Sequence, residues 1–217
     1  MASWARKPAV AREGGWLAYR QMDPRWPPLW HGAGVGIAQP AARWNVAGTH
    51  HDNYAQYLAC HPDGMWAELV RQLGLRGEDR RRQILRTVYR IRVRSPRVAD
   101  LRDFDRWQAC GLDPEIAIDD DHRRSRALAE ELRAAGFSGI LAPSASLPGH
   151  TNLTLFGPRQ EAPDDDTGVW PRPELFCPTV TVADRAAPPA GMDLHVRYLG
   201  TAHLAWERWR ARPVAVA

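Results

Sequence analysis

The segment from Leu85 to Arg94 constrains the fold most, because its apolar and charged side chains alternate. One set of alternate positions holds Leu85, Thr87, Tyr89, Ile91 and Val93, and the other set is rich in arginine, with Arg86, Arg90, Arg92 and Arg94. Successive side chains of a strand point to opposite faces, so this period of two predicts a β-strand with one buried and one charged face. The arginine face could bind nucleic acid, but charge on an exposed strand is also a common protection against aggregation.

Short strands and short helices alternate along the rest of the chain. Apolar runs predict strands at residues 16–20, 54–59, 140–142 and 152–156. Helical spacing predicts a helix over 64–73, stopped by Gly74, and a second over 123–135, stopped by Gly136. No regular strand–helix–strand repeat joins them, so we predict an α+β fold with a small mixed sheet and flanking helices. Farther along, we expect strands at 180–182 and 194–198 and a helix at 202–212.

Composition limits the class of protein. The chain has 217 residues, of which 44% are hydrophobic, enough for one domain with a core. Its net charge is +4 and Lys7 is its only lysine, an arginine bias that fits a GC-rich genome and would also favour an anionic partner. Cys60, Cys110 and Cys177 show no metal or disulfide spacing, so we expect a reducing cytoplasm. We find no signal peptide in residues 1–10 and no apolar run of transmembrane length.

Arg43 and Glu68 form the most suggestive pair of charges. A short strand and a helix are predicted to bring them to the same region. An arginine offers a planar set of donors that suits phosphate, and a carboxylate stabilises positive charge that develops during a reaction. A pocket with both groups suits a phosphate-bearing substrate that reacts through a cation. The same spacing also fits an ordinary surface salt bridge, and spacing alone does not separate the two interpretations.

Several short motifs follow one another in order: Tyr19-Arg20, Arg43-Trp44-Asn45-x-x-Gly48, Tyr57-Leu58-Ala59, Ala67-Glu68, Pro143-Ser144-Ala145 and Asn152-Leu153-x-Leu155-Phe156. Each motif is weak alone, but the ordered set resembles the RES-domain family from Trp16 to Pro158. That family is named for an arginine, a glutamate and a serine, matched here by Arg43, Glu68 and Ser144. One departure is Ala41-Ala42, where the family commonly has glycine before the arginine, so the backbone could approach a phosphate less closely.

The resemblance implies an ADP-ribosyltransferase-like fold with the sheet split around a nucleotide cleft. It also implies an enzyme that cleaves the nicotinamide–ribose bond of NAD by hydrolysis or phosphorolysis, with NAD as substrate and no cofactor. Many members are toxins held in check by a helix-turn-helix antitoxin, so such a partner is expected, with inorganic phosphate as a further ligand. An ADP-ribosyltransferase acting on a protein is an alternative, and an inactive basic nucleic-acid-binding module is another. For the main interpretation we expect no membrane and no directly bound nucleic acid.

The residues that match the family's motifs receive roles from the resemblance. The catalytic set is Arg43, Glu68 and Ser144, and the substrate-binding set is Tyr19, Arg20, Asn45, Tyr57 and Asn152. Cleavage would create an oxocarbenium-like centre, as at other glycosidic bonds, while nicotinamide leaves as a neutral molecule. The two arginines would hold the phosphates or the ribose, and the glutamate would face the cation or a ribose hydroxyl. The tyrosine at position 57 would contact the nicotinamide, and the serine and Asn152 would complete the polar surroundings.

Other chemistries fit the sequence less well. Ser144 lies in Pro-Ser-Ala-Ser and not in the Gly-x-Ser-x-Gly elbow of a serine hydrolase. The loop of Gly32, Gly34 and Gly36 lacks the P-loop lysine and the dinucleotide-binding pattern, so NAD is expected as a substrate and not as a hydride carrier. The run 119–122, three aspartates and a histidine, precedes a predicted helix, and capping explains it better than a metal site. We therefore expect no metal.

We predict three segments in the chain. Residues 1–15 form a loose basic leader, 16–158 form the RES-like catalytic domain, and 159–217 form a C-terminal extension of unknown role that packs on the same domain. The acidic, proline-containing stretch 160–167 is typical of a linker, and the charge run 76–86 is typical of a solvated connection.

Overall fold

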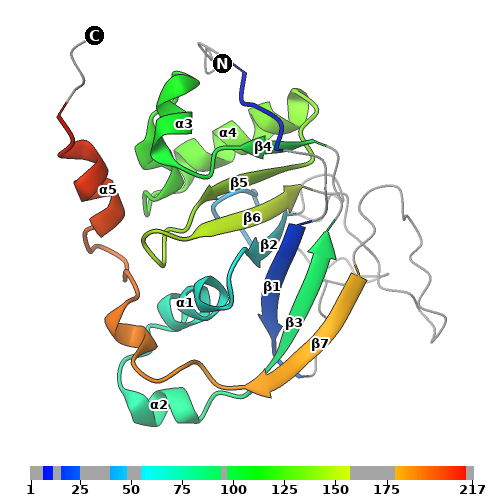
Figure 1. The fold of residues 1–217 in the computed structure, drawn as a ribbon, viewed down its shortest axis with the longest axis vertical. Helices are drawn as coiled ribbons and strands as arrows, with labels where there is room; N and C mark the ends of the chain where they lie inside the picture. Colours follow the sequence, from blue (N-terminus) through cyan, green and yellow to red (C-terminus); the bar gives the residue numbers. More distant parts are fainter. Residues whose placement is uncertain are drawn as a thin grey trace.

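The computed structural model describes residues 7–11, 16–24, 40–47, 55–93, 97–156 and 179–213. Its strands are β1 (Trp16–Met22), β2 (Ala55–Ala59), β3 (Arg86–Val93), β4 (Val98–Asp100), β5 (Gly139–Pro143), β6 (Thr151–Phe156) and β7 (Thr179–Ala186) (Figure 1). Its α-helices are α1 (Pro62–Gln72), α2 (Glu78–Arg82), α3 (Phe104–Ala109), α4 (Arg123–Ala134) and α5 (Leu204–Arg210), and its 3-10 helices are η2 (Pro114–Ala117) and η3 (Met192–Leu194). The glycine loop at 32–36 and the stretch 160–167 lie outside the described residues.

The strands form one seven-stranded sheet in the order β4-β5-β6-β2-β1-β3-β7. Every pair is antiparallel except β4 and β5, so the sheet is mixed and the predicted α+β class is confirmed. The link between β2 and β1 consists of one register pair, Tyr19 with Ala59, whereas β1 pairs with β3 along its whole length from Trp16 to Met22. The sheet is therefore split into two parts that meet at this narrow contact.

The alternating segment forms β3 as predicted. Tyr89, Ile91 and Val93 are buried, whereas Arg90 and Arg92 are exposed. Two details differ from the pattern. Leu85 precedes the strand and is exposed. Val88 is buried as well as Tyr89, because its side chain lies on the opposite face of the sheet, which α1 covers. β3 lies between β1 and β7, so its arginines line a face of the sheet and do not protect an edge.

Helix boundaries follow local capping groups. α1 begins two residues before the predicted start because the His61 side chain accepts a hydrogen bond from the amide of Asp63, and Pro62 suits the first helical position. Gly74, with φ of +60°, ends the helix as predicted. α4 likewise ends just before Gly136, whose φ is +79°. Within the charge run 76–86, the short helix α2 has no buried residue.

The expected strand at 194–198 is wrong. That segment begins at the last residue of η3 and continues through one turn residue into irregular backbone, because its polar groups bond to loops and not to a strand. The amide of Arg197 donates to the carbonyl of Ser146 at 2.8 Å, and the hydroxyl of Tyr198 donates to the carbonyl of Leu75. The sequence patterns also missed α3 and β4, which are short and lack a long periodic stretch.

Helix α1 covers one face of the sheet. Its Met65 and Val70 belong to a buried cluster with Ala59 of β2 and Val88 of β3, and Tyr19 packs against the same cluster. The other face carries a separate cluster that includes Ala18, Leu58, Ile91, Leu141 and Leu153. The two clusters alternate along β1 and β2, as the pleat requires. Side chains that are to meet α1 must therefore come from the first face.

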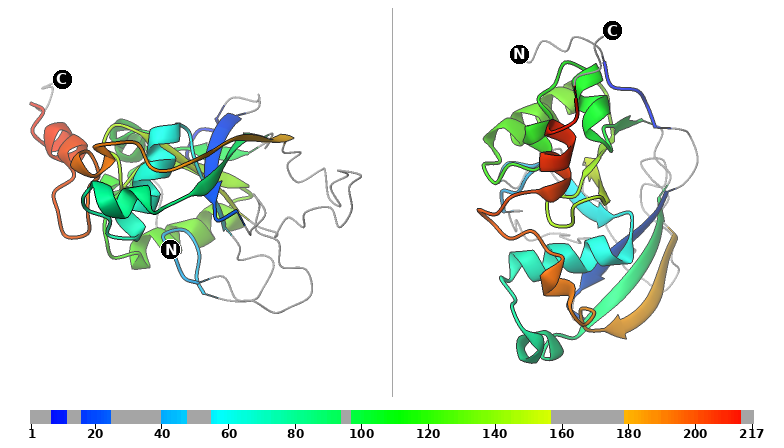
Figure 2. Two further views of the ribbon diagram at one scale, coloured as in Figure 1. Left: turned by 90° about the horizontal axis from the view of Figure 1, so that it is seen from below. Right: turned by 60° about the vertical axis from the view of Figure 1, so that its left-hand side comes forward.

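The C-terminal segment is built into the same structure. β7 pairs with β3, and the chain then passes beside α1 and reaches α3 with α5 (Figure 2). Trp206 of α5 packs edge-on against Phe104 of α3, with ring centroids 5.2 Å apart, and the indole of Trp209 donates to Asp105 at 2.7 Å. Among the described residues, no helix is both long and apolar enough to span a bilayer.

Candidate active site

Glu68 of α1 is held by two side chains from other elements. Asn152 of β6 donates its amide to Glu68 Oε1 at 2.7 Å, and the hydroxyl of Ser144, which follows β5, donates to the same oxygen at 3.3 Å. Glu68 is half-buried, and Ser144 is fully buried. Three residues that lie far apart in sequence thus meet at one carboxylate oxygen, in an arrangement that leaves Oε2 without a bond from either donor. The carboxylate is oriented, and within the described residues its Oε2 accepts no hydrogen bond.

Ser144 has a second, structural task. Its hydroxyl oxygen accepts hydrogen bonds from the amides of Ser146 at 3.3 Å and Leu147 at 3.1 Å, so it also caps the turn that follows β5. The hydroxyl proton is then directed to Glu68, because the oxygen's lone pairs are occupied by these amides. The Ser144 hydroxyl therefore both caps the turn and donates to Glu68.

Asn152 presents an unsatisfied oxygen beside Glu68. Its Oδ1 is buried and has no hydrogen-bond partner among the described residues. A buried acceptor without a donor carries a free-energy cost of about 1–3 kcal/mol. A ligand hydroxyl or amide that reached Glu68 could donate to this oxygen as well.

Arg43 lies in a tight turn, where Ala42 and Asn45 form a β-bridge. Its guanidinium donates to the carbonyl of Asp119 at 2.6 Å and, more weakly, to that of Ile116 at 3.4 Å. Burial lowers the pKa of Arg43 to about 10, with Glu68 opposing this shift as the largest charge effect. The guanidinium therefore stays charged at neutral pH and interacts electrostatically with Glu68. The Arg43 side chain is half-buried.

Tyr57 and Asn45 support the turn that carries Arg43. The hydroxyl of Tyr57 donates to Asn45 Oδ1 at 2.8 Å and accepts from the amide of Trp44, also at 2.8 Å. The amide group of Asn45 donates to the carbonyls of Pro40 and Val46. Asn45 is fully buried, and burial raises the pKa of Tyr57. The observed contacts of both polar groups are thus within the protein, and direct contact of either residue with a substrate stays a prediction.

Tyr19 and Arg20 lie on opposite faces of β1. Tyr19 packs with the α1 cluster, whereas Arg20 faces the side of Ala18 and donates to the side-chain oxygen of Gln56. Burial lowers the pKa of Arg20 to about 10. The structure brings Arg43, Ser144 and Asn152 to Glu68, and it does not bring Arg20 to them.

A network around Asp120 was not predicted from the sequence. Arg71 of α1 bonds one carboxylate oxygen at 2.5 Å, Arg197 contacts both oxygens at 3.0 and 3.3 Å, and the amide of Gly200 donates at 2.8 Å. Partial burial alone would raise the pKa of Asp120, but the Gly200 hydrogen bond and the two arginines outweigh it and lower the pKa. The network ties α1 and the C-terminal segment to the loop whose residue 119 holds Arg43.

The run 119–122 divides between two tasks. Asp121 accepts from the amide of Arg123 at 3.0 Å, as a capping residue does, and Asp119 accepts from the amide of Asp121 at 3.0 Å. Of the predicted capping of free helix amides, only the bond from Asp121 to the first amide of α4 is present; the N-cap itself is His122, whose side chain makes no capping bond, and Asp120 belongs to the arginine network. Arg71 lies one turn after Glu68 on α1, a spacing that could have suggested a shared site, but no local pattern points to Arg197.

The C-terminal segment also touches the turn after β5. His203 is buried, and its Nε2 lies 3.0 Å from the carbonyl oxygen of Ser144. Arg197 contacts the carbonyl of Ala145 at 3.4 Å. Residues near the end of the chain therefore hold the backbone on which the Ser144 side chain is mounted.

The fold and the site define an α+β domain in which a helix glutamate, a turn arginine and a loop serine converge. The RES domain family model matches residues 16–173, and the chain belongs to this family. Over 100 residues the chain is 35% identical to a probable NAD(+) phosphorylase of Mycobacterium tuberculosis. The match covers 46% of this chain and 47% of that protein, so the chain spans about half of the relative's length. The crystal structure of the M. tuberculosis MbcT-MbcA toxin-antitoxin complex contains a similar chain, with a TM-score of 0.49, 17% identity and coverage of 84% and 90%.

Proposed function

We propose that this protein cleaves the bond between nicotinamide and ribose in NAD. The observation that carries the proposal is the Glu68 carboxylate, which Asn152 and Ser144 hold beside the charged Arg43. Family membership and a relative named as a probable NAD(+) phosphorylase support the choice of NAD as substrate.

The chemistry needs charge and position more than acid or base catalysis. Nicotinamide leaves as a neutral group, so its departure needs no strong general acid. The ribose carbon becomes oxocarbenium-like, and a fixed carboxylate near it is stabilising because the charge is already in place before reaction. Arg43 supplies a two-pronged donor set for the diphosphate. Asn152 Oδ1 offers an acceptor for a ribose hydroxyl.

The charge around the site favours one anionic ligand, such as the diphosphate of NAD, and the phosphate branch is left to experiment. The guanidinium groups of Arg43, Arg71 and Arg197 surround the carboxylates of Glu68 and Asp120, which gives three positive and two negative charges and a net charge of +1. Arg20 does not add to this excess, because it faces the other side of the sheet. Inorganic phosphate could enter beside the ribose and compete with water, which would make the product ADP-ribose-1″-phosphate in place of ADP-ribose.

The first experiment measures free nicotinamide released from NAD by the pure protein. We expect release by the parent and a fall on the order of 10²–10³ in rate for Glu68→Gln, because removal of one electrostatic contact to a transition state has effects of this size. Glu207→Gln, at an exposed position on α5, is the matched control and should keep the parent rate. A folded Glu68→Gln protein with the parent rate would refute the role of this carboxylate.

The second experiment identifies the acceptor. Phosphorus NMR of the products across a phosphate titration should show a growing share of ADP-ribose-1″-phosphate. ADP-ribose alone at every phosphate concentration would leave hydrolysis as the reaction. Labelled NAD incubated with a cell extract tests protein modification, which would appear as label on protein.

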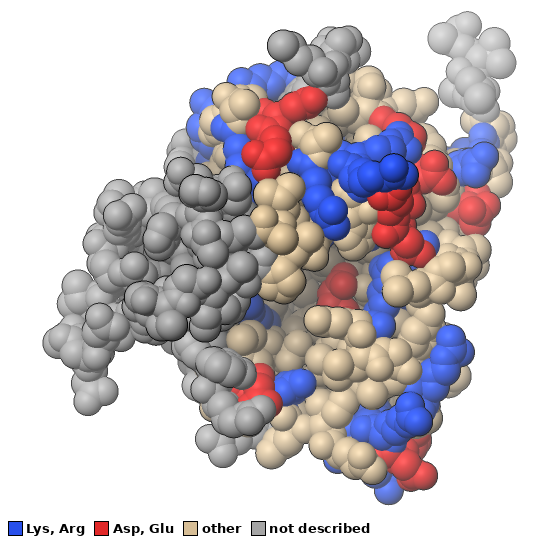
Figure 3. All heavy atoms as spheres, turned by 180° about the vertical axis from the view of Figure 1, so that it is seen from behind, with Lys and Arg blue, Asp and Glu red and all other residues tan. Residues whose placement is uncertain are grey.

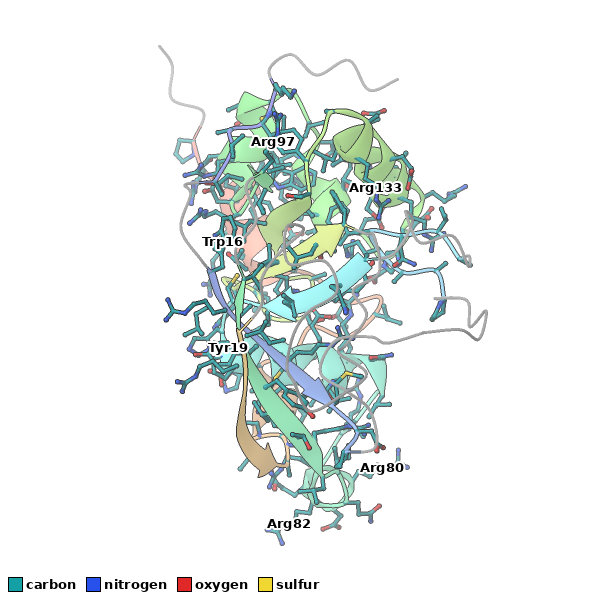
Figure 4. The ribbon with its side chains drawn as sticks, turned by 90° about the vertical axis from the view of Figure 1, so that its right-hand side faces the viewer. Trp16, Tyr19, Arg80, Arg82, Arg97 and Arg133 are labelled. Atoms are coloured by element: carbon teal, nitrogen blue, oxygen red, sulfur yellow. The ribbon has the colours of Figure 1, made fainter. Side chains whose placement is uncertain are left out.

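The nucleic-acid alternative finds little support in the charge distribution. On the face shown in Figure 3, basic and acidic side chains lie beside one another and do not form one continuous basic area. Arg80 and Arg82 lie at one end of the molecule, whereas Arg97 and Arg133 lie toward the other end (Figure 4). A helix-turn-helix antitoxin, which the family resemblance implies, stays a prediction. Co-purification with the product of a neighbouring open reading frame would test it.

A further inference from the structure

Two histidines and an aspartate gather beside the candidate active site. His61 and Asp63 belong to the start of α1, and His150 ends the turn between β5 and β6. One potential ligand atom from each residue lies within 4.8 Å of the other two. The rings of the two histidines are 5.3 Å apart between centroids in an edge-on arrangement, and His61 Nδ1 is 3.5 Å from Asp63 Oδ2.

Helix capping explains two of these three residues. His61 accepts the amide of Asp63, and an acidic residue suits the first turn of a helix. Capping does not explain His150. Its Nδ1 is buried and has no hydrogen-bond partner among the described residues, although a ring nitrogen is a donor or an acceptor in every protonation state. A ligand that satisfied this nitrogen would remove an unfavourable feature of the folded protein.

We propose that His61, Asp63 and His150 bind a divalent transition metal ion, with zinc as the reference ion. Two imidazoles and one carboxylate form a ligand set that zinc accepts, and the fourth tetrahedral position would be left to water. With metal–ligand bonds of about 2.0–2.1 Å, neighbouring tetrahedral ligands lie about 3.4 Å apart, close to the 3.5 Å between His61 Nδ1 and Asp63 Oδ2. Calcium and magnesium prefer sets made wholly of oxygen and do not suit two imidazoles.

The exposure of the ligands also fits. His61 Nδ1 is unprotonated, since it accepts the Asp63 amide at 3.2 Å, and coordination at this nitrogen would replace that hydrogen bond. The side chains of His61 and Asp63 are 54% and 49% exposed, so an ion can enter from solvent and both groups can make the small rotations that coordination requires. The positive end of α1 disfavours a cation there, and the charge of Asp63 offsets it.

A metal at this place would join the two segments that carry the candidate catalytic groups. His61 lies on the helix of Glu68, and His150 accepts the amide of Ser144 at its carbonyl oxygen, 2.8 Å away. Coordination would therefore cross-link the start of α1 to the turn behind Ser144. This inference does not depend on the reaction proposed above, because metal binding is measured without NAD.

The test is a zinc titration of chelator-treated, full-length protein by calorimetry, with the absorption of bound cobalt as a second readout. We expect one zinc per chain and at least a tenfold loss of affinity in both His150→Gln and Asp63→Asn. His195→Gln, at an exposed histidine of the C-terminal segment, is the control and should bind as the parent does.

Folding of each metal-free variant is checked by circular dichroism. If His150→Gln does not fold, the half-exposed Asp63→Asn decides the question. Absence of stoichiometric zinc binding by the parent would overturn the proposal. Binding that neither substitution weakens would also overturn it, because the ion would then lie elsewhere on the chain.

Discussion

Replacement of Asp120 by asparagine should destabilise the protein far more than its place in a loop suggests. Asp120 lies between Arg71 and Arg197, whose side chains are only 8% and 10% exposed. Removing one partner from a buried ion pair costs about 3–5 kcal/mol, because the remaining charge is left without compensation. Asp120 is itself 28% exposed and asparagine keeps one acceptor oxygen, so we reduce the expected loss to about 2 kcal/mol.

The loss is measured by urea and thermal unfolding of the purified variant. For a protein of this size, 1 kcal/mol corresponds to about 2–4 °C, so Asp120→Asn should lower Tm by about 4–8 °C. Asp121→Asn is the matched control, because Asp121 pairs with an Arg123 side chain that is 85% exposed, and its Tm should stay close to the parent value. Equal Tm values for the two variants would refute the central position of Asp120.

The contribution of Asp120 to the free energy of unfolding should also depend on pH. The folded-state pKa of Asp120 is lowered, so its contribution to stability is fully present above the unfolded-state pKa of about 4 and is lost as pH falls through the lower folded-state value. The difference in unfolding free energy between the parent and Asp120→Asn should therefore be constant near neutral pH and shrink below about pH 4. A difference that grew on acidification would contradict the assignment.

Two further substitutions address the turn that carries Arg43. Arg43→Lys should weaken NAD binding about ten- to a hundredfold, since loss of a charge-assisted contact costs about 1.5–3 kcal/mol. Equilibrium binding measures the affinity, with the exposed Arg80→Lys as control. An affinity of Arg43→Lys equal to that of the parent would place Arg43 outside the phosphate site. Tyr57→Phe leaves the amide of Trp44 and Asn45 Oδ1 without their partner and should cost about 1–3 kcal/mol in urea unfolding, whereas an unchanged stability would show that the turn does not depend on this hydroxyl.

Local patterns determined the elements whose causes are local. The alternation around Tyr89 predicted β3, and the spacing of Met65 and Leu69 with Gly74 behind them predicted α1. These predictions succeeded because side-chain periodicity and the conformational freedom of glycine act within a few residues. The prediction of a strand at 194–198 was wrong because its cause is not local: the apolar residues resemble a strand, but the backbone bonds to Ser146, far away in sequence.

For the candidate site, the sequence predicted which residues take part, and the tertiary structure decided how they are arranged. The ordered motifs named Arg43, Glu68 and Ser144, and no distance between them follows from the sequence. Only the tertiary structure placed Ser144 and Asn152 on one oxygen of Glu68 and separated Arg20 from them, because residues 19 and 20 of a strand face opposite sides.

Contacts between residues far apart in sequence could not be predicted from local patterns. Arg197 reaches Asp120 across 77 positions of sequence, and His150 meets His61 only because β6 pairs with β2. Sequence patterns raised a metal site only at the cysteines and at 119–122, where both were set aside, and gave no sign of the histidines that the fold brings together. Sequence determines which side chains are available and how each short segment bends, whereas strand pairing and helix packing decide which of them share one small volume, where electrostatic and hydrogen-bond energies become large enough to act.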